Sequence, residues 1–132
     1  MEAAVLLGTD NQSTDYIKKL VDFLLEVDVD MAEFSILTPF PHTPATERYE
    51  KQGRILHKDW KKYTTAEVVF QPKQMTTDEL QEMYHYAWKM FYDEVPQAQR
   101  MSRLFFQVLE KEIADGTYQP SLNKASQRSW KE

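Results

Sequence analysis

The stretch over residues 31–44 constrains the fold of this chain more than any other. It reads as an apolar strand that Pro39 and Pro41 stop, because proline fixes φ and has no backbone N–H to donate to a sheet. Thr43 followed by Pro44 is a typical helix start, with a side-chain acceptor at the cap and proline at the first helical position. In parallel α/β sheets, ligands usually bind at the turn after a strand's carboxyl end. We therefore expect this loop to form half of any functional site.

The residues before this stretch complete a βαβ unit. Residues 3–7 are a continuous apolar run, as expected for a strand that is buried on both faces. A helix from Ser13 or Thr14 to about Glu26 has apolar residues at the i, i+3, i+4 and i+7 spacing of one face. Residues 31–37 form the second strand. Two strands joined by such a helix should be parallel.

The second half of the sequence is mostly helical. We expect, in order, a helix from Thr43 to about Gln52, a third strand or extended segment at 66–70, a helix that begins with the capping box Thr76 to Glu79 and ends before Pro96, a helix over 97–114 and a polar tail at 117–132. Two or three strands do not make a self-sufficient sheet, because each edge leaves N–H and C=O groups unpaired. The edges should be covered by the chain's own helices or by a second copy, or the sheet should belong to a larger one.

Composition excludes several classes of function. The 132 residues include no cysteine, which excludes disulfides, thiolate zinc sites and cysteine nucleophiles within the chain and fits a cytoplasmic protein. The net charge of -5 argues against a nucleic-acid binder. No apolar run approaches the roughly 20 residues that span a bilayer, so no membrane span is predicted.

Three groups of residues could carry chemistry, and each has a plainer structural explanation. Gly8-Thr9-Asp10 could let a ligand approach the backbone, but it is also ordinary turn chemistry. His42, His57 and His85 lack metal-binding spacing, so no metal site is predicted. An aromatic-rich helix could floor a pocket for a flat ligand, although such stripes are more often core: Tyr84, Tyr86, Trp88, Phe91 and Tyr92. No triad or carboxylate pair is found, so no catalytic residue is assigned.

Two motifs carry a resemblance to a known family. The first is Phe-Ser-Ile-Leu-Thr-Pro-Phe-Pro-His-Thr-Pro at 34–44, preceded by an apolar strand, Gly8-Thr9-Asp10 and a helix. The second is Val-Phe-Gln-Pro-Lys-Gln-Met at 69–75, followed by Trp88-x-x-Phe91-Tyr92. Together they resemble the second half of a radical S-adenosylmethionine barrel, in the group of enzymes with an N-terminal cobalamin-binding domain. Within that group the sequence is most similar to the anaerobic magnesium-protoporphyrin IX monomethyl ester oxidative cyclases, over about residues 3–95.

The resemblance implies an α/β fold, namely a βαβ fragment of a parallel (βα)6 partial TIM barrel followed by a helical C-terminal extension. Residues 1–56 would be the last two βα units of the radical SAM barrel, 57–116 the helical extension and 117–132 a flexible tail. A strand-like run begins directly after Met1 and the sheet neighbours are missing. We therefore expect the chain to be a C-terminal fragment of a longer polypeptide.

The resemblance also implies where a cofactor would lie. In the family, the fifth strand and the turn after it pack along the adenosine of S-adenosylmethionine, and the sixth strand closes the barrel near the adenine or the substrate. The corresponding cofactor-binding residues here are Val5, Leu7, Gly8, Asp10, Phe34, Ser35 and Thr38. The family's 4Fe-4S iron-sulfur cluster is held by cysteines, which this chain lacks, so we expect no cofactor to bind the fragment alone. The parent would use S-adenosylmethionine, the cluster and cobalamin.

Three functional hypotheses follow. The chain could be the C-terminal piece of a radical SAM, cobalamin-dependent Fe-S oxidoreductase or methyltransferase, contributing barrel closure and a substrate cap without catalysis of its own. Its partners would be the cluster and cobalamin domains of the parent and a small hydrophobic substrate, such as a porphyrin of bacteriochlorophyll biosynthesis, and it should self-associate through its sheet edges. The alternative is a stand-alone helical interaction domain. A small nucleotide-binding α/β protein is a third reading.

Overall fold

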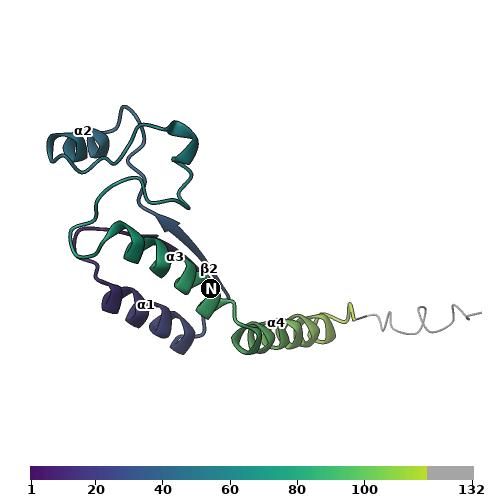
Figure 1. The fold of residues 1–132 in the computed structure, drawn as a ribbon. Coiled ribbons are helices and arrows are strands. Elements are labelled where there is room, and N and C mark those ends of the chain that lie inside the picture. The colour runs from purple at the N-terminus through teal and green to yellow at the C-terminus, as the bar shows by residue number, and fades with distance from the viewer. Residues whose placement is uncertain (119–132) are drawn as a thin grey trace, which may run out of the picture. The chain divides into compact units, whose positions relative to one another are not determined.

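The computed structural model describes residues 1–118, which form a mixed α/β structure with a two-stranded parallel sheet and four α-helices. The elements, shown in Figure 1, are β1 (Glu2–Leu7), α1 (Thr14–Glu26), β2 (Met31–Ile36), α2 (Pro44–Lys51), a 3₁₀ helix (Trp60–Lys62), α3 (Thr77–Phe91) and α4 (Glu94–Ala114). The chain divides into two units, Met1–Gln97 and the part from Ala98 onward, which are described separately. From residue 119, the predicted tail at 117–132 lies outside the described residues.

The predicted βαβ unit is confirmed. Strands β1 and β2 are parallel, with Glu2 opposite Met31 and Leu7 opposite Ile36. Helix α1 connects them, and its N-cap is Ser13, whose hydroxyl accepts a hydrogen bond from the next turn of the helix. A parallel pair needs such a crossover, because a tight hairpin can join only antiparallel strands.

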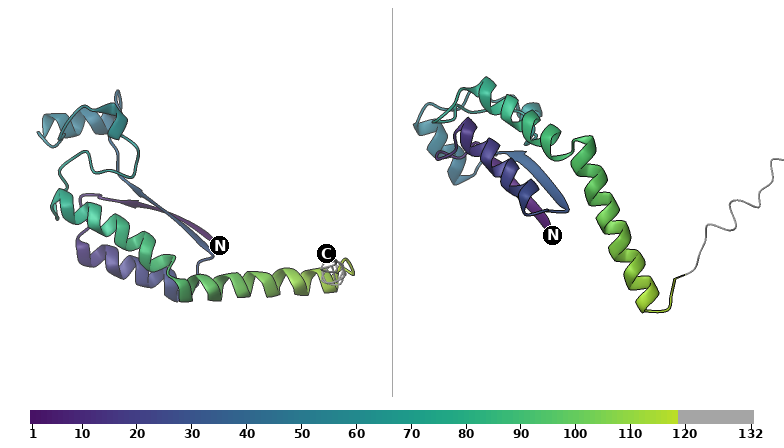
Figure 2. Two further views of the ribbon diagram at one scale, coloured as in Figure 1. Left: turned by 45° about the vertical axis from the view of Figure 1, so that its right-hand side comes forward. Right: turned by 90° about the horizontal axis from the view of Figure 1, so that it is seen from below.

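Helices α1 and α3 both pack against one face of the sheet, as the left view of Figure 2 shows. On that face Leu7 is fully buried and Phe34 is 2% exposed, and both join the main hydrophobic core. On the opposite face Leu6 is 46% exposed. The expectation that the first strand is buried on both faces is therefore wrong for residues 1–118, because the helices of this part of the chain cover only one side of the sheet.

The segment at 66–70 does not form a third strand. Phe70 makes an isolated antiparallel bridge with Ile55, and its neighbour Val69 is fully buried. The Phe70 ring stacks on Tyr49 of α2 with their centroids 5.2 Å apart. The extended alternative of the prediction describes this segment better, since Val69 and Phe70 are buried while the backbone forms one isolated bridge and no ladder.

Local capping signals predict the starts of α2 and α3 correctly and the start of α4 incorrectly. Thr43 is the N-cap of α2, and Thr76 with Glu79 forms the predicted capping box of α3, with hydrogen bonds of 2.7 and 3.1 Å. Helix α4 begins at Glu94, earlier than expected, and includes Pro96 in its first turn. The first turn tolerates proline because the N–H groups there have no partner within the helix.

The part of the chain from Ala98 onward contains most of α4. Three of its apolar residues, Met101, Phe105 and Val108, are 60%, 63% and 57% exposed. Across the described 118 residues, no helix combines the length and the apolar character needed to cross a membrane.

Candidate functional site

The uncovered face of the sheet carries a shallow hollow of about 210 Å³. Ala4 and Leu6 of β1 and Glu33 and Ser35 of β2 line it, because alternate residues of a strand point to the same face, and Val5 completes the lining. Ala4 and Ser35 are small, so the floor of the hollow leaves room for a ligand. Glu33 adds a carboxylate and Ser35 a hydroxyl. The face therefore offers one carboxylate acceptor and one hydroxyl among apolar side chains.

The turn after β1 is fixed by hydrogen bonds from one side chain. Gln12 accepts from the N–H groups of Gly8 and Thr9, at 2.7 and 3.2 Å, and its amide donates to the Leu6 carbonyl at 3.0 Å. Gly8 has a φ of 95°, and an added Cβ would lie 2.8 Å from a methyl carbon of Leu80. Glycine is required here both by the backbone angle and by the close approach of α3.

Two cations hold the carboxylate of Asp10 at the end of this turn. Arg54 and Lys73 each place a nitrogen 2.9 Å from one of its oxygens. The hydrogen bond from Arg54, followed by the one from Lys73, lowers the pKa of Asp10 below its ordinary value. Gln74 also donates to the Asp10 carbonyl at 3.0 Å. Asp10 is therefore ionised at neutral pH, and Arg54, Lys73 and Gln74 hold it in place.

Arg54 is itself held by three kinds of contact. Its side chain is 10% exposed and pairs with Asp10, its Nε donates to the Gln71 carbonyl at 2.7 Å, and its guanidinium lies 4.5 Å from the centre of the Tyr49 ring. Sequence reasoning missed both Arg54 and Lys73 as site residues. Each lies far along the chain from Asp10, and no local pattern links an arginine after one helix to a turn before another.

The loop after β2 borders a second hollow, of about 350 Å³. Thr38 at its start donates a hydrogen bond to the Ile36 carbonyl at 3.0 Å. His42 has a positive φ of 64°, which is uncommon outside glycine. The lining combines acidic, basic and aromatic side chains: Pro41, His42, Thr46, Glu47, Glu50, Lys58 and Trp60. As predicted, the loop lies at the carboxyl end of a parallel strand.

The residues predicted to contact a cofactor fall into three groups. Leu7 and Phe34 lie in the core, and Val5 packs against it. Gly8 and Thr38 follow the carboxyl ends of the two paired strands. The turn from Gly8 continues to Asp10, which pairs with the side chains of Arg54 and Lys73. Ser35 lies on the uncovered face. The structure thus brings Gly8, Asp10 and Thr38 to one end of the sheet, where Gly8 is buried against Leu80 of α3.

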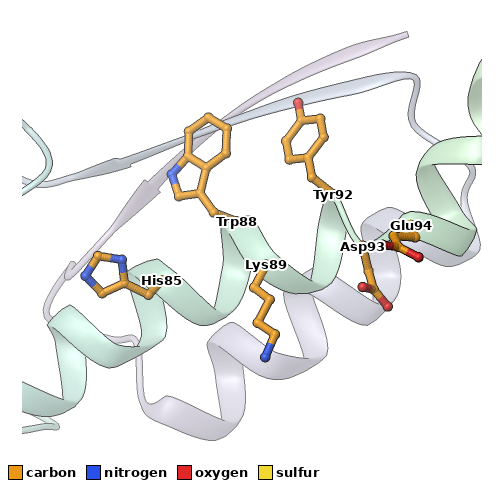
Figure 3. A pocket seen from close by; sticks show the side chains of 6 residues that line it. All are labelled: His85, Trp88, Lys89, Tyr92, Asp93 and Glu94. Carbon is orange, nitrogen blue, oxygen red and sulfur yellow. The ribbon is translucent and has the colours of Figure 1, made fainter.

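The aromatic residues of α3 serve mainly the core. Phe91 is fully buried, and Trp88 and Tyr92 pack against the core while also lining a surface pocket of about 560 Å³. Figure 3 shows both rings pointing toward the strands and Lys89 pointing away from them. His85, Asp93 and Glu94 complete the pocket. Both predictions for this helix therefore apply, because its aromatic rings pack against the core and also line a pocket.

The histidines lie in separate environments. His42 borders the loop after β2, His57 accepts a hydrogen bond from Asp59 at 3.3 Å, and His85 lies 3.3 Å from Gln81. Within residues 1–118, no group of three histidine, aspartate or glutamate side chains is arranged to hold a metal ion.

Comparison with known families identifies the chain by its second half. Residues 43–130, more than half of the sequence, match the model of a domain of unknown function, DUF4070. The chain belongs to the DUF4070 family. The matched region begins at the N-cap of α2, so it includes α2, α3, α4 and both cations that hold Asp10.

Three curated proteins are similar to this DUF4070 chain. Bacteriochlorophyllide d C-12(1)-methyltransferase of Chlorobaculum tepidum is 35% identical over 60% of the chain. An uncharacterized methyltransferase of Pyrococcus horikoshii is 28% identical over 66%, and the anaerobic magnesium-protoporphyrin IX monomethyl ester cyclase of Cereibacter sphaeroides is 24% identical over 67%. The resemblance to the anaerobic cyclases is therefore confirmed. These matches cover 17%, 19% and 16% of the relatives, so the chain corresponds to a small part of each.

Proposed function

We propose that this DUF4070 chain is the C-terminal part of a radical S-adenosylmethionine enzyme, a methyltransferase or an oxidative cyclase. In this proposal, residues 1–56 supply the last two βα units of a (βα)6 partial barrel, 57–116 form a helical cap over the substrate, and 117–132 are a tail. The names of two relatives support the reaction classes, because one is a methyltransferase and the other a cyclase.

The observation that carries the proposal is the uncovered, partly polar face of the sheet. Helices α1 and α3 cover the other face, and the uncovered face holds a hollow next to the carboxyl ends of parallel strands. Strands of a (βα) barrel have this asymmetry, because the helices form the outer ring and the barrel interior receives side chains and ligands. A two-stranded sheet that folds by itself would be expected to cover this face, because isolated strand pairs are only marginally stable.

The chemistry of this face fits the adenosine part of S-adenosylmethionine. The small side chains of Ala4 and Ser35 leave room for a flat base, and the hydroxyl of Ser35 and the carboxylate of Glu33 are suited to ribose or amine groups. The Gly8 turn ends β1 at the same end of the sheet, and Gly8 itself is buried against Leu80 and Phe70. We assign Asp10, Ser35 and Thr38 to the ligand side, and Leu7, Gly8 and Phe34 to the buried part that supports it. Val5 packs against the core and also lines the hollow.

The iron-sulfur cluster of such an enzyme would be bound outside this chain. The 132-residue sequence contains no cysteine, and thiolates are the usual cluster ligands. Bound there, the cluster would supply the electron that cleaves S-adenosylmethionine. The residues of this chain would instead orient the adenosine and exclude water from it. Cobalamin, where it is used, would likewise be held by another domain.

We propose a flat, largely apolar macrocycle as the substrate. The names of two relatives include a bacteriochlorophyllide and a magnesium-protoporphyrin ester, which are of this kind. On this chain, Phe40 and Trp60 are 45% and 50% exposed, in the loop after β2 and in the 3₁₀ helix that borders the hollow there. Exposed aromatic rings at the carboxyl end of a strand could stack on a macrocycle that enters from that side.

A chimera tests the proposal. This chain would replace the corresponding region of the Chlorobaculum tepidum methyltransferase, and equilibrium dialysis would measure the dissociation constant for S-adenosylmethionine. Ser35→Trp, which fills the hollow, should weaken binding by about tenfold or more, whereas Ser35→Ala should change it less than about threefold. Equal affinities for the two variants, with unchanged circular dichroism, would show that this face is not the ligand face.

One observation favours the alternative of a helical interaction domain. The exposed apolar residues of α4, Met101, Phe105 and Val108, form a face of the kind that binds other proteins. The sequence upstream in the source reading frame discriminates the two functions. Cysteine-bearing sequence there supports the radical enzyme, and a complete gene that starts at Met1 supports the interaction domain.

A further inference from the structure

A loop between α2 and α3 is closed at its base by backbone contacts. Ile55 forms a bridge with Phe70, and the Leu56 N–H donates to the Val69 carbonyl at 3.1 Å. Val69 and Phe70 are fully buried, so this base is part of the core. We call residues 57–68, which the base joins into a loop, the strap. A compact loop with its ends held together presents its tip at the surface.

Further hydrogen bonds attach the second half of the strap to neighbouring elements. The Thr65 carbonyl accepts from the Ile36 N–H, at the end of β2, with a distance of 2.7 Å. Gln81 of α3 donates to the Ala66 carbonyl at 3.0 Å and accepts from the Val68 N–H at 3.2 Å. The strap is therefore fixed against both β2 and α3, at the carboxyl end of the strand.

Two aromatic rings order the tip of the strap. Tyr63 is 7% exposed, and its hydroxyl donates to the His57 carbonyl at 2.7 Å. Trp60 packs edge-to-face on Tyr63 with centroids 4.9 Å apart and stays 50% exposed. With Pro41 and residues of α2, Trp60 lines the hollow of about 350 Å³, and Figure 1 shows α2 beyond the arrowhead of β2. The indole is therefore held at one side by the protein and offers the rest of its surface to a flat ligand.

The tip of the strap is basic, although the chain as a whole has a net charge of -5. Residues 58–62 contain three lysines and one aspartate. Asp59 accepts from the Lys61 N–H at 3.3 Å, so its carboxylate caps the backbone of the 3₁₀ helix. Lys61 and Lys62 are exposed, and across residues 1–118 neither ammonium group has an ion-pair partner. Two cations next to the exposed indole are therefore free to bind an anion.

The wall that α2 contributes to the hollow is acidic. Glu47 and Glu50 both line it, and Lys58 pairs with Glu50 at 2.6 Å. The carboxylate of Glu47 would repel an anionic group, whereas the lysines at the tip of the strap would attract it. A ligand in the hollow would therefore direct an anionic group toward the strap and away from α2.

We propose that the strap recognises a carboxylate arm of a planar aromatic substrate. The ring system stacks on the indole of Trp60, and the carboxylate binds the ammonium groups of Lys61 and Lys62. Lysine is a flexible point charge that fixes no bidentate geometry, which suits a carboxylate at the end of a flexible arm. This inference rests on the proposed function for the macrocycle and adds one requirement, namely that the macrocycle carries a free carboxylate.

Fluorescence titration of the 132-residue chain with two porphyrins tests this requirement. Protoporphyrin IX carries carboxylate arms, and its dimethyl ester has the same ring with those charges removed. In the same non-ionic detergent, the free acid should bind about tenfold more tightly than the ester. The difference should shrink in about 1 M salt, because salt screens exposed charges. Equal affinities of the acid and the ester at low salt would overturn the proposal.

A double substitution assigns the difference to the strap. Lys61→Met combined with Lys62→Met should weaken binding of the free acid by about tenfold and that of the ester by less than about twofold. The matched control is Lys18→Met combined with Lys19→Met, because these adjacent lysines of α1 are also exposed and Lys19 lines a groove with aromatic residues. The control should leave both affinities unchanged. Equal losses for the two double variants would overturn the assignment to the strap.

The indole provides a separate measurement. Trp60→Leu should weaken binding of the acid and the ester to a similar degree, because stacking does not depend on the charge of the arm. Failure of both porphyrins to bind would overturn the macrocycle of the proposed function together with this inference, whereas equal binding of both would overturn the carboxylate alone. None of these titrations contains S-adenosylmethionine. Failure of the strap is therefore distinguishable from failure of the ligand face.

Discussion

Arg54 reaches from the end of α2 to the turn after β1 and joins two segments that local sequence does not connect. Its guanidinium donates to Asp10, Gln52 and the Gln71 carbonyl, and it lies over the Tyr49 ring. Because its side chain is nearly buried, these bonds are screened little by water. Single residues of this kind hold the Gly8 turn in the shape that the proposed ligand site needs.

We predict that Arg54→Met destabilises the fold, because it leaves Asp10 with one cation and the Gln71 carbonyl without its donor. The loss in free energy of unfolding should be about 1–3 kcal/mol, measured by urea denaturation. The matched control is Lys58→Met, which removes a salt bridge to Glu50 whose side chains are 63% and 40% exposed. That pair should contribute less than about 1 kcal/mol. Equal losses for the two variants would contradict this account of Arg54.

A pH dependence follows from Asp10. Its pKa is lowered from 3.8 by pairing with Arg54 and then Lys73, so the folded state binds fewer protons there than the unfolded state. The stabilisation is present in full well above pH 3.8 and is lost as the pH falls through the lower, folded-state pKa. The free-energy advantage of the wild type over Asp10→Asn should therefore shrink in acid. An advantage that stays constant down to pH 2 would contradict the pairing.

At the scale of secondary structure, α3 both covers the sheet and ends it. Its buried face packs on the core, and its last residues bring Tyr92 to the backbone of β2. A strand edge that is closed by a side chain cannot recruit another strand. Helix α3 therefore fixes the side on which the sheet can grow.

Tyr92→Phe should loosen the edge of β2 without unfolding the protein, since it removes one hydroxyl and keeps the ring. We predict that the Ala32 amide exchanges about tenfold faster, with a loss of about 1 kcal/mol in stability. The control is Tyr84→Phe, whose ring meets Trp88 of the same helix edge-to-face and which should leave the Ala32 exchange rate unchanged. An unchanged exchange rate at Ala32 in Tyr92→Phe would show that the edge is protected in another way.

Elements governed by neighbouring residues could be predicted from sequence, and contacts between distant segments could not. Thr43 and the Thr76 capping box mark helix starts correctly because the cap and its donor are three residues apart. The contact of Asp10 with Arg54 and that of Tyr92 with Ala32 join residues 44 and 60 positions apart, beyond any local pattern. Pro96 misled the prediction because the same residue can end one helix or lie in the first turn of the next.

At the scale of the whole chain, β1 carries more apolar surface than the described residues bury. A continuous apolar run predicts burial on two faces, and the structure buries one and leaves Leu6 46% exposed on the other. The loop after β2 could be located from sequence, because Pro39 and Pro41 end the strand there. The hollow formed by Ala4, Glu33 and Ser35 could not, since its existence depends on which face the helices leave free.

Calorimetric titration of the isolated 132-residue chain with S-adenosylmethionine tests the central claim most directly, namely that this chain forms only part of a ligand site. The account predicts weak binding or none, because the residues that would hold the methionine end of the ligand lie outside the chain. Saturable binding with a micromolar dissociation constant would contradict it and show that the chain forms a complete site.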